Sequence, residues 1–352
     1  MRKTTSKFFL SAITAAVLTL SAPAQAGLIF NITDTGNAQA NAGFKAAGDY
    51  WSSVFTDDIT INIQAGFANL GANILGSASS TYVSVGFDVM KIVLDADATS
   101  ADDAKFLAGL PTGNSYSKLI NGTNQNAGAA HLHSNITTLR MTSANAKAQG
   151  FNVVGALFDA TINFSNLFAW DFDQTDGIGA GLIDFVGVAI HELGHAMGFT
   201  SGVDILDTNF GRFNDNQFDP FATVLDFTRC STESVQAGAS MDWTARTTDK
   251  NFALDGKCSG PDLVENAWST GRNRGDGNQA SHWKDNNGLG IMDPTAAPRG
   301  VLNVVTPLDI QALDVIGWDL AKTQQVPAPA GILLFCSGLV GLSLLRRRKT
   351  QQ

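Results

Sequence analysis

Residues 191–199 read HELGHAMGF, and this stretch decides which fold we expect. On a helix, His191 and His195 lie one turn apart, so both imidazoles point the same way and can bind one zinc ion. Glu192, next to the first histidine, is placed to take a proton from a water held by such an ion. Glutamate is scarce in this chain, and one of only three occupies the middle of the pattern. The sequence therefore predicts a catalytic zinc site.

The residues on either side of the motif support this prediction. Residues 182–190, LIDFVGVAI, are almost wholly apolar and indicate a buried helix that would seat the metal inside a cleft. Gly198 follows at a spacing where a glycine can turn the chain beneath a metal. A bare HExxH also occurs by chance in unrelated proteins, but the rarity of glutamate here and the glycine both argue against chance.

A third ligand has to come from elsewhere in the chain, because a catalytic zinc site usually has three protein ligands and one water. With the spacing HExxHxxGxxH the third histidine would fall at Ser201, and serine is a poor zinc ligand. The carboxylates that could replace it and the remaining histidines are Asp204, Asp207, Glu233, Glu265, His131, His133 and His282.

Among these candidates, His282 has the most distinctive setting. It lies in QASHWK, residues 279–284, and is followed by GIMDP at residues 290–294. His131 and His133 lie in a stretch rich in Asn, Gly and Ala, so we expect them to face the solvent. His282 is therefore the histidine that best fits a third ligand.

With these motifs the chain resembles the leishmanolysin-like metalloproteases of the metzincin group. Members of that family carry HExxHxxGF, delay the third histidine by a long insertion, place it in a Ser-His-Trp setting and follow it with a methionine turn. The resemblance covers about residues 182–200 and 278–295 and is thin elsewhere. It implies that Glu192 is the general base. The residues that it assigns to zinc binding and to the floor of the site are His191, His195, His282, Met292 and Gly198.

The same resemblance implies an α+β fold, that of a zincin-like, two-lobed metalloprotease. We expect a mixed sheet and the active-site helix in an N-terminal lobe, residues 27–200, and a loop-rich C-terminal lobe, residues 201–322. Two features depart from the family. Its eukaryotic members are rich in cysteine and use a propeptide cysteine to silence the zymogen, whereas this chain has no cysteine before Cys230. The Asp-Pro that follows Met292 also differs from their turn.

The hydrophobic pattern elsewhere predicts a mixture of helices and strands. Residues 160–164 alternate apolar and polar side chains, and they form either an exposed edge that can pair with a peptide or an ordinary interior strand. Gly, Asn, Asp and Ser dominate residues 201–287, which predicts long loops with short helices. The other predicted elements are helices at 37–55, 101–109, 136–149 and 306–320 and a strand at 59–63.

The two ends of the chain predict export. Residues 1–26 have a basic start, a short apolar core and the exit Ala-Gln-Ala, which are the marks of a secretory signal peptide. Residues 323–352 contain VPAP, an apolar run and RRRK, and resemble the PEP-CTERM sorting signal of Gram-negative bacteria, although Ala328 replaces its glutamate. A sorting protease of the exosortase type would remove this tail after transient anchoring, leaving the protein extracellular or at the cell surface. The alternative is a plain membrane anchor with its basic end in the cytoplasm.

Composition agrees with an exported protein. The two end segments hold seven of the 23 Lys and Arg residues and none of the 32 acids, so the part between them carries a formal charge of −16. Nucleic-acid binding, which needs clustered positive charge, is not expected. Cys230 and Cys258 can form a disulfide in an oxidising compartment. The aspartates that could form calcium sites are Asp95, Asp97, Asp102 and Asp103 in one group and Asp171, Asp173 and Asp176 in another.

These observations together predict a zinc-dependent endopeptidase acting on a protein or peptide. Two other classes of function stay open. One is a non-catalytic matrix or adhesion protein in which zinc is a structural clamp, and the other is a zinc hydrolase that acts on a non-peptide amide. The sequence predicts neither the cleavage preference nor the oligomeric state.

Overall fold

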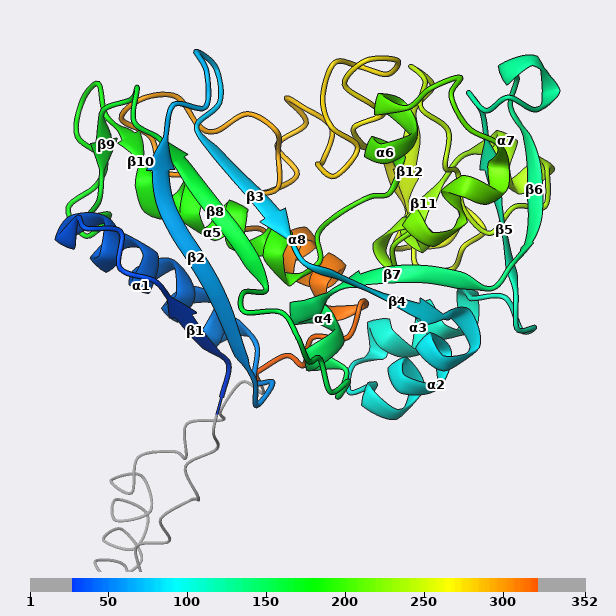
Figure 1. Ribbon diagram of the computed structural model, residues 1–352, viewed down its shortest axis with the longest axis horizontal. Helices are drawn as coiled ribbons and strands as arrows, with labels where there is room; N and C mark the ends of the chain where they lie inside the picture. Colours follow the sequence, from blue (N-terminus) through cyan, green and yellow to red (C-terminus); the bar gives the residue numbers. More distant parts are fainter. Residues whose placement is uncertain (1–26, 322–352) are drawn as a thin grey trace, which may run out of the picture.

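The computed structural model describes residues 27–321 (Figure 1). The signal peptide predicted at 1–26 and the sorting segment predicted at 323–352 therefore lie outside the described residues. Within them, helices and strands are mixed in an α+β arrangement, as the sequence predicts. In this part of the chain no helix is both long enough and apolar enough to cross a membrane.

A four-stranded sheet packs against the helix that carries the HELGH motif. Its strands are β1 (Ile29–Ile32), β2 (Thr60–Ala68), β8 (Ala160–Ser165) and β3 (Gly76–Ser80), in the order β1-β2-β8-β3. The first three strands run parallel, whereas β3 pairs antiparallel with β8 and forms an edge. Helices α1 (Ala38–Val54) and α5 (Phe185–Met197) pack against each other and against this sheet, on the left of Figure 1.

Aromatic side chains join these two helices to the sheet. The Phe44 ring on α1 packs edge-on against Phe164 of β8 and Phe185 of α5, with both centroid distances at 5.2 Å. Phe164 and Phe185 are 4.3 Å apart. All three side chains are fully buried, so each stabilises the fold by roughly 1.5–3 kcal/mol through the loss of apolar surface to water. This cluster fixes the position of the first turn of α5.

The structure settles the two alternatives for residues 160–164. These residues lie in β8, which is an interior strand between β2 and β3, so the prediction of an exposed edge at this position is wrong. The edge belongs instead to β3, which the sequence analysis did not predict. Its sequence, GSASS, has small polar side chains and no apolar alternation that would signal a strand.

Residues 136–149 do not form the single helix that was predicted. The structure divides them into β7 (Thr138–Thr142) and α4 (Ser143–Ala148). Strand β7 pairs antiparallel with β4 (Tyr82–Gly86). The Thr142 side chain accepts a hydrogen bond from the backbone N–H of Asn145, and this cap marks the change from strand to helix. The predicted helix at 306–320 is also shorter, because α8 (Pro307–Asp314) ends before the turn at Gly317.

Residues 201–287 contain the predicted short helices and, in addition, a small sheet that was not predicted. Strands β11 (Arg229–Cys230), β12 (Lys250–Phe252) and β13 (Val264–Trp268) form an antiparallel sheet, and a disulfide between Cys230 and Cys258 ties it to the next loop. These strands are too short for a periodic pattern to reveal them.

The remaining elements of the described chain are α2 (Phe87–Asp97), α3 (Ala101–Gly109), β5 (Tyr116–Ile120), η1 (Asn126–Gly128), β6 (His131–Ile136), β9 (Trp170–Asp171), β10 (Ile183–Asp184), α6 (Val203–Thr208), η2 (Asp215–Phe221), η3 (Leu225–Thr228) and α7 (Thr232–Gln236).

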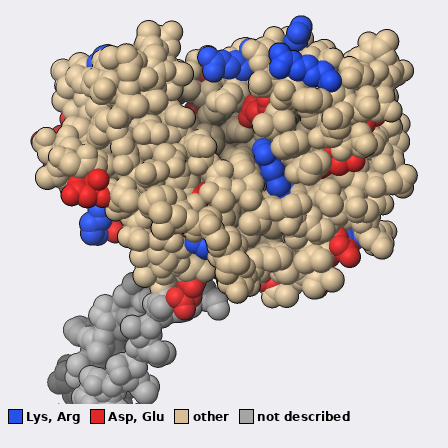
Figure 2. All heavy atoms as spheres, viewed as in Figure 1, with Lys and Arg blue, Asp and Glu red and all other residues tan. Residues whose placement is uncertain are grey.

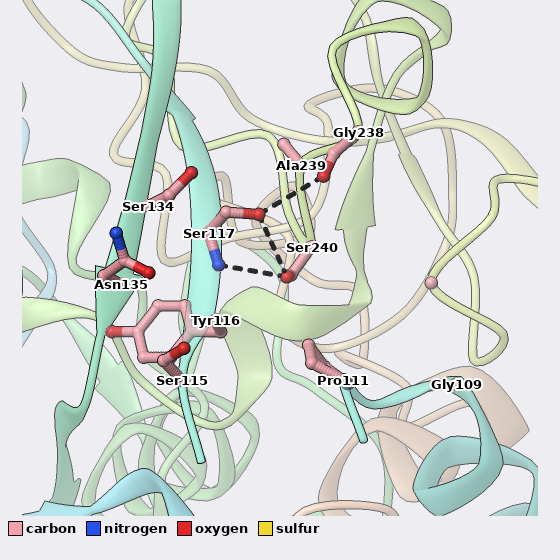
Figure 3. Close-up of a pocket in the computed structure, with 11 residues that line it drawn as sticks. Gly109, Pro111, Ser115, Tyr116, Ser117, Ser134, Asn135, Gly238, Ala239 and Ser240 are labelled. Carbon is pink, nitrogen blue, oxygen red and sulfur yellow. Dashed lines mark hydrogen bonds between the residues drawn. The ribbon is translucent and has the colours of Figure 1, made fainter. Parts of the chain in front are cut away.

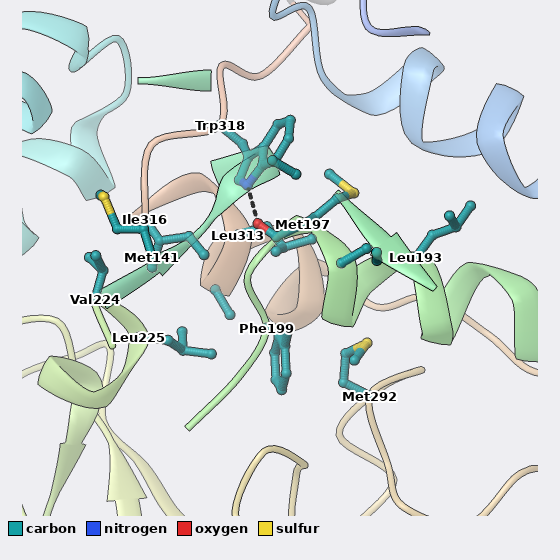
Figure 4. Packing of buried hydrophobic residues seen from close by; sticks show 14 of the residues in the cluster. Met141, Leu193, Met197, Phe199, Val224, Leu225, Met292, Leu313, Ile316 and Trp318 are labelled. Atoms are coloured by element: carbon teal, nitrogen blue, oxygen red, sulfur yellow. Dashed lines mark hydrogen bonds between the residues drawn. The ribbon is translucent and has the colours of Figure 1, made fainter. Parts of the chain in front are cut away.

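Contacts join the parts of the chain before and after the boundary predicted at residue 200. The backbone of Leu119 in β5 pairs with that of Asp242, and Phe55 after α1 pairs with Leu320 near the end of the described chain. Trp318 donates from its indole Nε1 to the carbonyl oxygen of Met197 at 2.9 Å, as Figure 4 shows. The last described residues are therefore packed against α1 and α5.

Candidate metal centre

Helix α5, which carries the HELGH motif, is fixed at both ends. Asp184 caps its beginning by accepting a hydrogen bond from the backbone N–H of Gly187 at 2.8 Å. Gly198 ends it with a φ of 119°, in the left-handed region that favours glycine. A Cβ at this position would also lie 3.0 Å from Ile316 and 3.2 Å from Asn145. The chain consequently turns sharply at Gly198, directly after the HELGH motif.

The structure brings the three predicted histidine ligands together. The Nε2 atom of His195 lies 3.0 Å from Nε2 of His191 and 3.2 Å from Nε2 of His282. In residues 27–321 this is the one group of three or more metal-ligating side chains whose ligand atoms all lie within 4.8 Å of one another. His282 thus reaches the helix histidines across a large separation in sequence.

Each ring is oriented by a backbone carbonyl on its far side. His191 Nδ1 donates to the Ile291 oxygen at 2.7 Å, and His195 Nδ1 donates to the Phe199 oxygen at 2.7 Å. The Nδ1 atom of His282 lies 3.2 Å from the oxygen of Gln279. With Nδ1 protonated in this network, the three Nε2 lone pairs face one another. This is the outer-shell arrangement that orients histidine ligands of a metal.

Burial keeps these imidazoles in the form that binds a metal. It lowers the pKa of His191, and it lowers the pKa of His195 to about 3 with help from the neighbouring His191. Burial, together with both neighbouring histidines, holds the pKa of His282 well below its usual range. All three rings are therefore neutral at neutral pH, and only a neutral imidazole can ligate.

His282 is held in place by an aspartate that the sequence analysis considered as a ligand. The Asp204 carboxylate accepts hydrogen bonds from the backbone N–H of Ala280 at 2.6 Å and of Ser281 at 3.2 Å, and from the Ser281 hydroxyl. The backbone N–H of Ser201 donates to that same hydroxyl at 2.8 Å. Asp204 thus fastens the loop carrying the third histidine to the segment that follows α5.

The other carboxylate candidates lie outside the histidine group. Asp207 accepts hydrogen bonds from the backbone N–H groups of Asn273 and Arg274. Glu233 forms an ion pair with Arg246, and Glu265 is exposed. None of these carboxylates has the position of a third ligand.

Met292, predicted to form the floor of the site, lies against helix α5. It is fully buried, and a Cβ added at Gly194 of α5 would lie 2.7 Å from its sulfur atom. Figure 4 shows Met292 next to α5. Glycine at position 194 is thus what allows this methionine to approach the helix next to His195.

Asp309 connects the methionine turn to the segment around the third histidine. Its fully buried carboxylate accepts from the backbone N–H of Ile291 at 2.8 Å and of Met292 at 3.1 Å. It also accepts from the indole Nε1 of Trp283 at 2.8 Å. The sequence analysis missed Asp309. The only local signal is its place in a capping box with Thr306 at the start of α8.

Glu192 points from α5 towards the edge strand β3. Its side chain is 5% exposed, and burial raises its pKa to about 8, against the effect of a hydrogen bond from the backbone N–H of Ala78. A Cβ on Gly76 would collide with its Oε1 atom. The absence of a side chain at Gly76 therefore leaves room for the carboxylate beside the free edge of the sheet.

His131 and His133 lie outside the group of three histidines, but they are half-buried and bonded to aspartates instead of facing the solvent as predicted. His131 Nε2 lies 2.7 Å from Asp215 and His133 Nε2 lies 2.8 Å from Asp219. Lys118, which is fully buried, donates to the Phe218 carbonyl oxygen of the same segment at 3.0 Å. Together these side chains attach η2 to the β5–β6 hairpin.

The two aspartate groups considered for calcium do not form a cage in the described part of the chain. Asp103 accepts from the backbone N–H groups of Thr99 and Ser100 at the start of α3. Asp171 accepts from the backbone N–H of Gly179, and Asp173 from Thr175. These carboxylates stabilise turns and a helix end.

Comparison of the chain with models of protein families, with curated proteins and with solved structures finds no match. The resemblance to leishmanolysin-like proteases therefore stays a prediction that rests on the motifs. What the geometry offers on its own is a group of three neutral imidazoles, two of them on a helix that also carries the buried Glu192.

Proposed function

We propose that this protein is an exported, zinc-dependent endopeptidase with a two-lobed, zincin-like fold. The observation that carries the proposal is the convergence of three Nε2 atoms, with Glu192 adjacent to the first ligand in the sequence. Export and the removal of the C-terminal tail by a sorting protease rest on the sequence of the two chain ends.

The donor set fits zinc. Zinc binds neutral imidazole nitrogen, and a catalytic site has three protein ligands with one position open. In residues 27–321 the group contains three histidines and no fourth metal-ligating side chain. A structural clamp normally has four protein ligands, so this set favours catalysis over the matrix or adhesion alternative. His191, His195 and His282 would hold the ion.

The reaction would combine this ion with the proton chemistry of Glu192. Bound zinc supplies a Lewis acid that polarises a carbonyl group and makes water more acidic. The Glu192 carboxylate takes the proton from the attacking water and delivers it to the leaving amine.

The edge strand β3 gives the substrate a place to bind. In the described sheet it pairs only with β8, so its other edge can accept an extended peptide through backbone hydrogen bonds. Glu192 lies against this strand at Gly76 and Ala78. A peptide bound there would pass beside the carboxylate, which favours a peptide substrate over other amides.

Glu192→Ala tests the role of the base. We expect zinc content to be unchanged and the hydrolysis of labelled casein to fall by at least about a hundredfold, since general base catalysis contributes about 10²–10⁴-fold. Zinc is measured by elemental analysis and hydrolysis by fluorescence release, with chelator-treated protein as the blank. Glu265→Ala, which changes an exposed glutamate, is the matched control and should keep full activity. An unchanged rate in Glu192→Ala would falsify the assignment.

His282→Ala tests the third ligand. Removing one of three ligands should weaken zinc binding by at least about a hundredfold, because a site with two imidazoles retains little affinity. Competition with a chromogenic chelator measures the affinity in the variant and in Glu265→Ala. Full zinc retention by the histidine variant would show that another residue supplies the third ligand.

A further inference from the structure

A cavity of about 670 Å³ opens beside α6 in a part of the molecule that the metal centre does not use. Three of its lining side chains are arginines, in a chain whose acids outnumber its basic residues. Within residues 27–321, none of these arginines forms an ion pair. We name this the arginine pocket, and its lining residues are Asp207, Thr208, Phe210, Arg212, Arg272, Asn273 and Arg274.

The one carboxylate that lines the arginine pocket, that of Asp207, already accepts hydrogen bonds from the neighbouring loop. Asp207 accepts from the backbone N–H of Asn273 at 2.7 Å, from that of Arg274 at 2.8 Å and from the Asn273 amide at 3.0 Å. It is buried, and it fixes the loop instead of neutralising a guanidinium group. The exposed arginine side chains on this loop are therefore available to an anion from outside.

Contacts hold one arginine of the pocket and the backbone of its loop in place. Arg274 stacks on the Phe210 ring, with its guanidinium carbon 4.9 Å from the ring centroid, which leaves the N–H edges free. The Phe210 ring in turn lies against Gly122, where a Cβ would collide with it. A Cβ at Gly275 would collide with the Thr270 backbone, so the loop carrying the arginines makes a turn that only glycine allows. A preorganised pocket loses little entropy when it binds a ligand.

The arginine pocket and the third histidine share one loop and one helix. Asp204 and Asp207 are three residues apart on α6, so they lie on the same side of the helix about 4.5 Å apart along its axis. Asp204 holds the loop next to His282, and Asp207 holds it next to Arg274. Figure 2 shows blue basic side chains gathered at the top of the molecule, over α6 and the neighbouring loops, beside a hollow in the surface. The pocket and the third histidine are thus anchored to the same side of α6.

A second cavity, of about 410 Å³, offers no comparable chemistry (Figure 3). No charged side chain lines it. Its serine groups bond to one another, with the Ser117 backbone N–H donating to the Ser240 hydroxyl at 3.1 Å and the Ser117 hydroxyl donating to the Gly238 oxygen at 3.3 Å. We therefore assign no ligand to it.

We infer that the arginine pocket binds acidic side chains of the polypeptide substrate while the metal centre cleaves it. This inference rests on the proposed function. Guanidinium groups bind carboxylates through two parallel hydrogen bonds, and a cluster of them favours a segment with several acids over a single one. A polypeptide is favoured over a free anion or an anionic polysaccharide because the pocket shares its loop with the third histidine.

A binding measurement tests the inference without requiring turnover. Fluorescein-labelled hexaglutamate is titrated with the full-length, zinc-loaded Glu192→Ala protein and followed by fluorescence anisotropy. We expect it to bind, and we expect Arg272→Ala/Arg274→Ala to weaken binding by at least about tenfold. The matched control is Lys257→Ala/Arg299→Ala, which removes the same charge at two exposed residues outside the pocket. Equal weakening in both double variants would mean attraction by overall charge and would overturn the inference.

Competition and cleavage separate the remaining outcomes. Displacement of hexaglutamate by polygalacturonate or by inorganic phosphate at lower concentration than by unlabelled hexaglutamate would overturn the choice of a polypeptide. With active protein, a peptide ending in three glutamates should be cleaved with a KM at least about tenfold lower than its glutamine analogue, and the arginine double variant should remove that difference. If neither peptide is cleaved, the proposed function fails, while the anisotropy result still decides whether the pocket binds an acidic peptide.

Discussion

The position of the Glu192 carboxylate depends on the absence of a side chain at Gly76. Gly76 lies on the edge strand β3, and a Cβ there would collide with the carboxylate oxygen of Glu192. The backbone N–H of Ala78 on the same strand donates to that carboxylate. The position of the proposed base is therefore fixed by the strand at which the substrate would bind.

Gly76→Ala should slow peptide hydrolysis by at least about tenfold while leaving zinc content unchanged. The added methyl group would push the Glu192 carboxylate out of place, and a displacement of about 1 Å can cost about a hundredfold in rate. The casein assay and zinc analysis measure the two quantities. Gly113→Ala, at an exposed glycine with open space around it, is the control. Equal rates for both variants would show that the collision is relieved without effect on the base.

The local sequence predicts some residues of the site and not others. His191, Glu192 and His195 follow from one helical spacing, and His282 follows from its setting in a recognisable motif. Asp309 and Gly76 could not be predicted in this way. Each acts on a partner that is distant in sequence, and a buried aspartate or a strand glycine carries no local signal of such a partner.

At the scale of elements, Asp309 holds the methionine turn and α8 together. Its buried carboxylate accepts from the backbone of Ile291 and Met292 and from Trp283, and also from the backbone N–H of Thr306. Four donors from three segments therefore depend on one side chain. Without it they would remain buried with no partner.

Asp309→Ala should lower the free energy of unfolding by about 3–5 kcal/mol. Each buried donor left without a partner costs about 1–3 kcal/mol, and the costs are only partly additive. Urea denaturation followed by tryptophan fluorescence measures the change. Asp173→Ala removes an exposed aspartate that bonds within its own turn, and it should cost less than about 1 kcal/mol. A loss as small as that in the Asp309 variant would contradict the role assigned to this carboxylate.

Length and pattern explain which elements could be predicted. The helix at 37–55 and the strand at 160–164 correspond to α1 and β8, which have clear periodicity and, in α1, an Asn37 cap. The helix at 101–109 corresponds to α3, which begins with a capping box. Strands β11 to β13 were missed because strands of two to five residues give no period, and their pairing depends on contacts distant in sequence.

The stability of the whole molecule depends on three carboxyl groups that are partly protonated near neutral pH. Burial and neighbouring aspartates raise the pKa of Asp57, Asp97 and Asp314 to about 7. Their pKa in an unfolded chain is near 3.9, so the folded protein binds more protons than the unfolded chain up to about pH 7. Stability must therefore fall as the pH rises through this range.

The titration of His131 also lowers the stability of the folded protein as the pH rises. Burial lowers its pKa, but the hydrogen bonds to the Ala129 carbonyl and to Asp215 outweigh this effect and raise the pKa above its usual value. The protonated ring stabilises the folded state fully below about pH 6.5, its unfolded pKa. That stabilisation is lost as the pH rises through the raised folded pKa.

We therefore expect the metal-free protein to be less stable at pH 8 than at pH 7, on the order of 1–2 kcal/mol. The lower limit of this window keeps the unfolded histidines mostly neutral, and removing the metal excludes the pH dependence of zinc binding. Thermal unfolding in the presence of a chelator measures the difference. Asp314→Asn cannot titrate and should reduce it. A melting temperature that is constant or higher at pH 8 would contradict these pKa shifts.

The hydrogen bond from the Trp318 indole to the end of α5 can form only after Trp318 has been synthesised. Ribosomes release a chain from its amino end, so the HELGH helix emerges before His282, before the methionine turn and well before this tryptophan. A nascent chain would hold two imidazoles on a helix whose far end is not yet braced. The proposed hydrolytic activity would accordingly arise only after Trp318 has emerged and packed against α5.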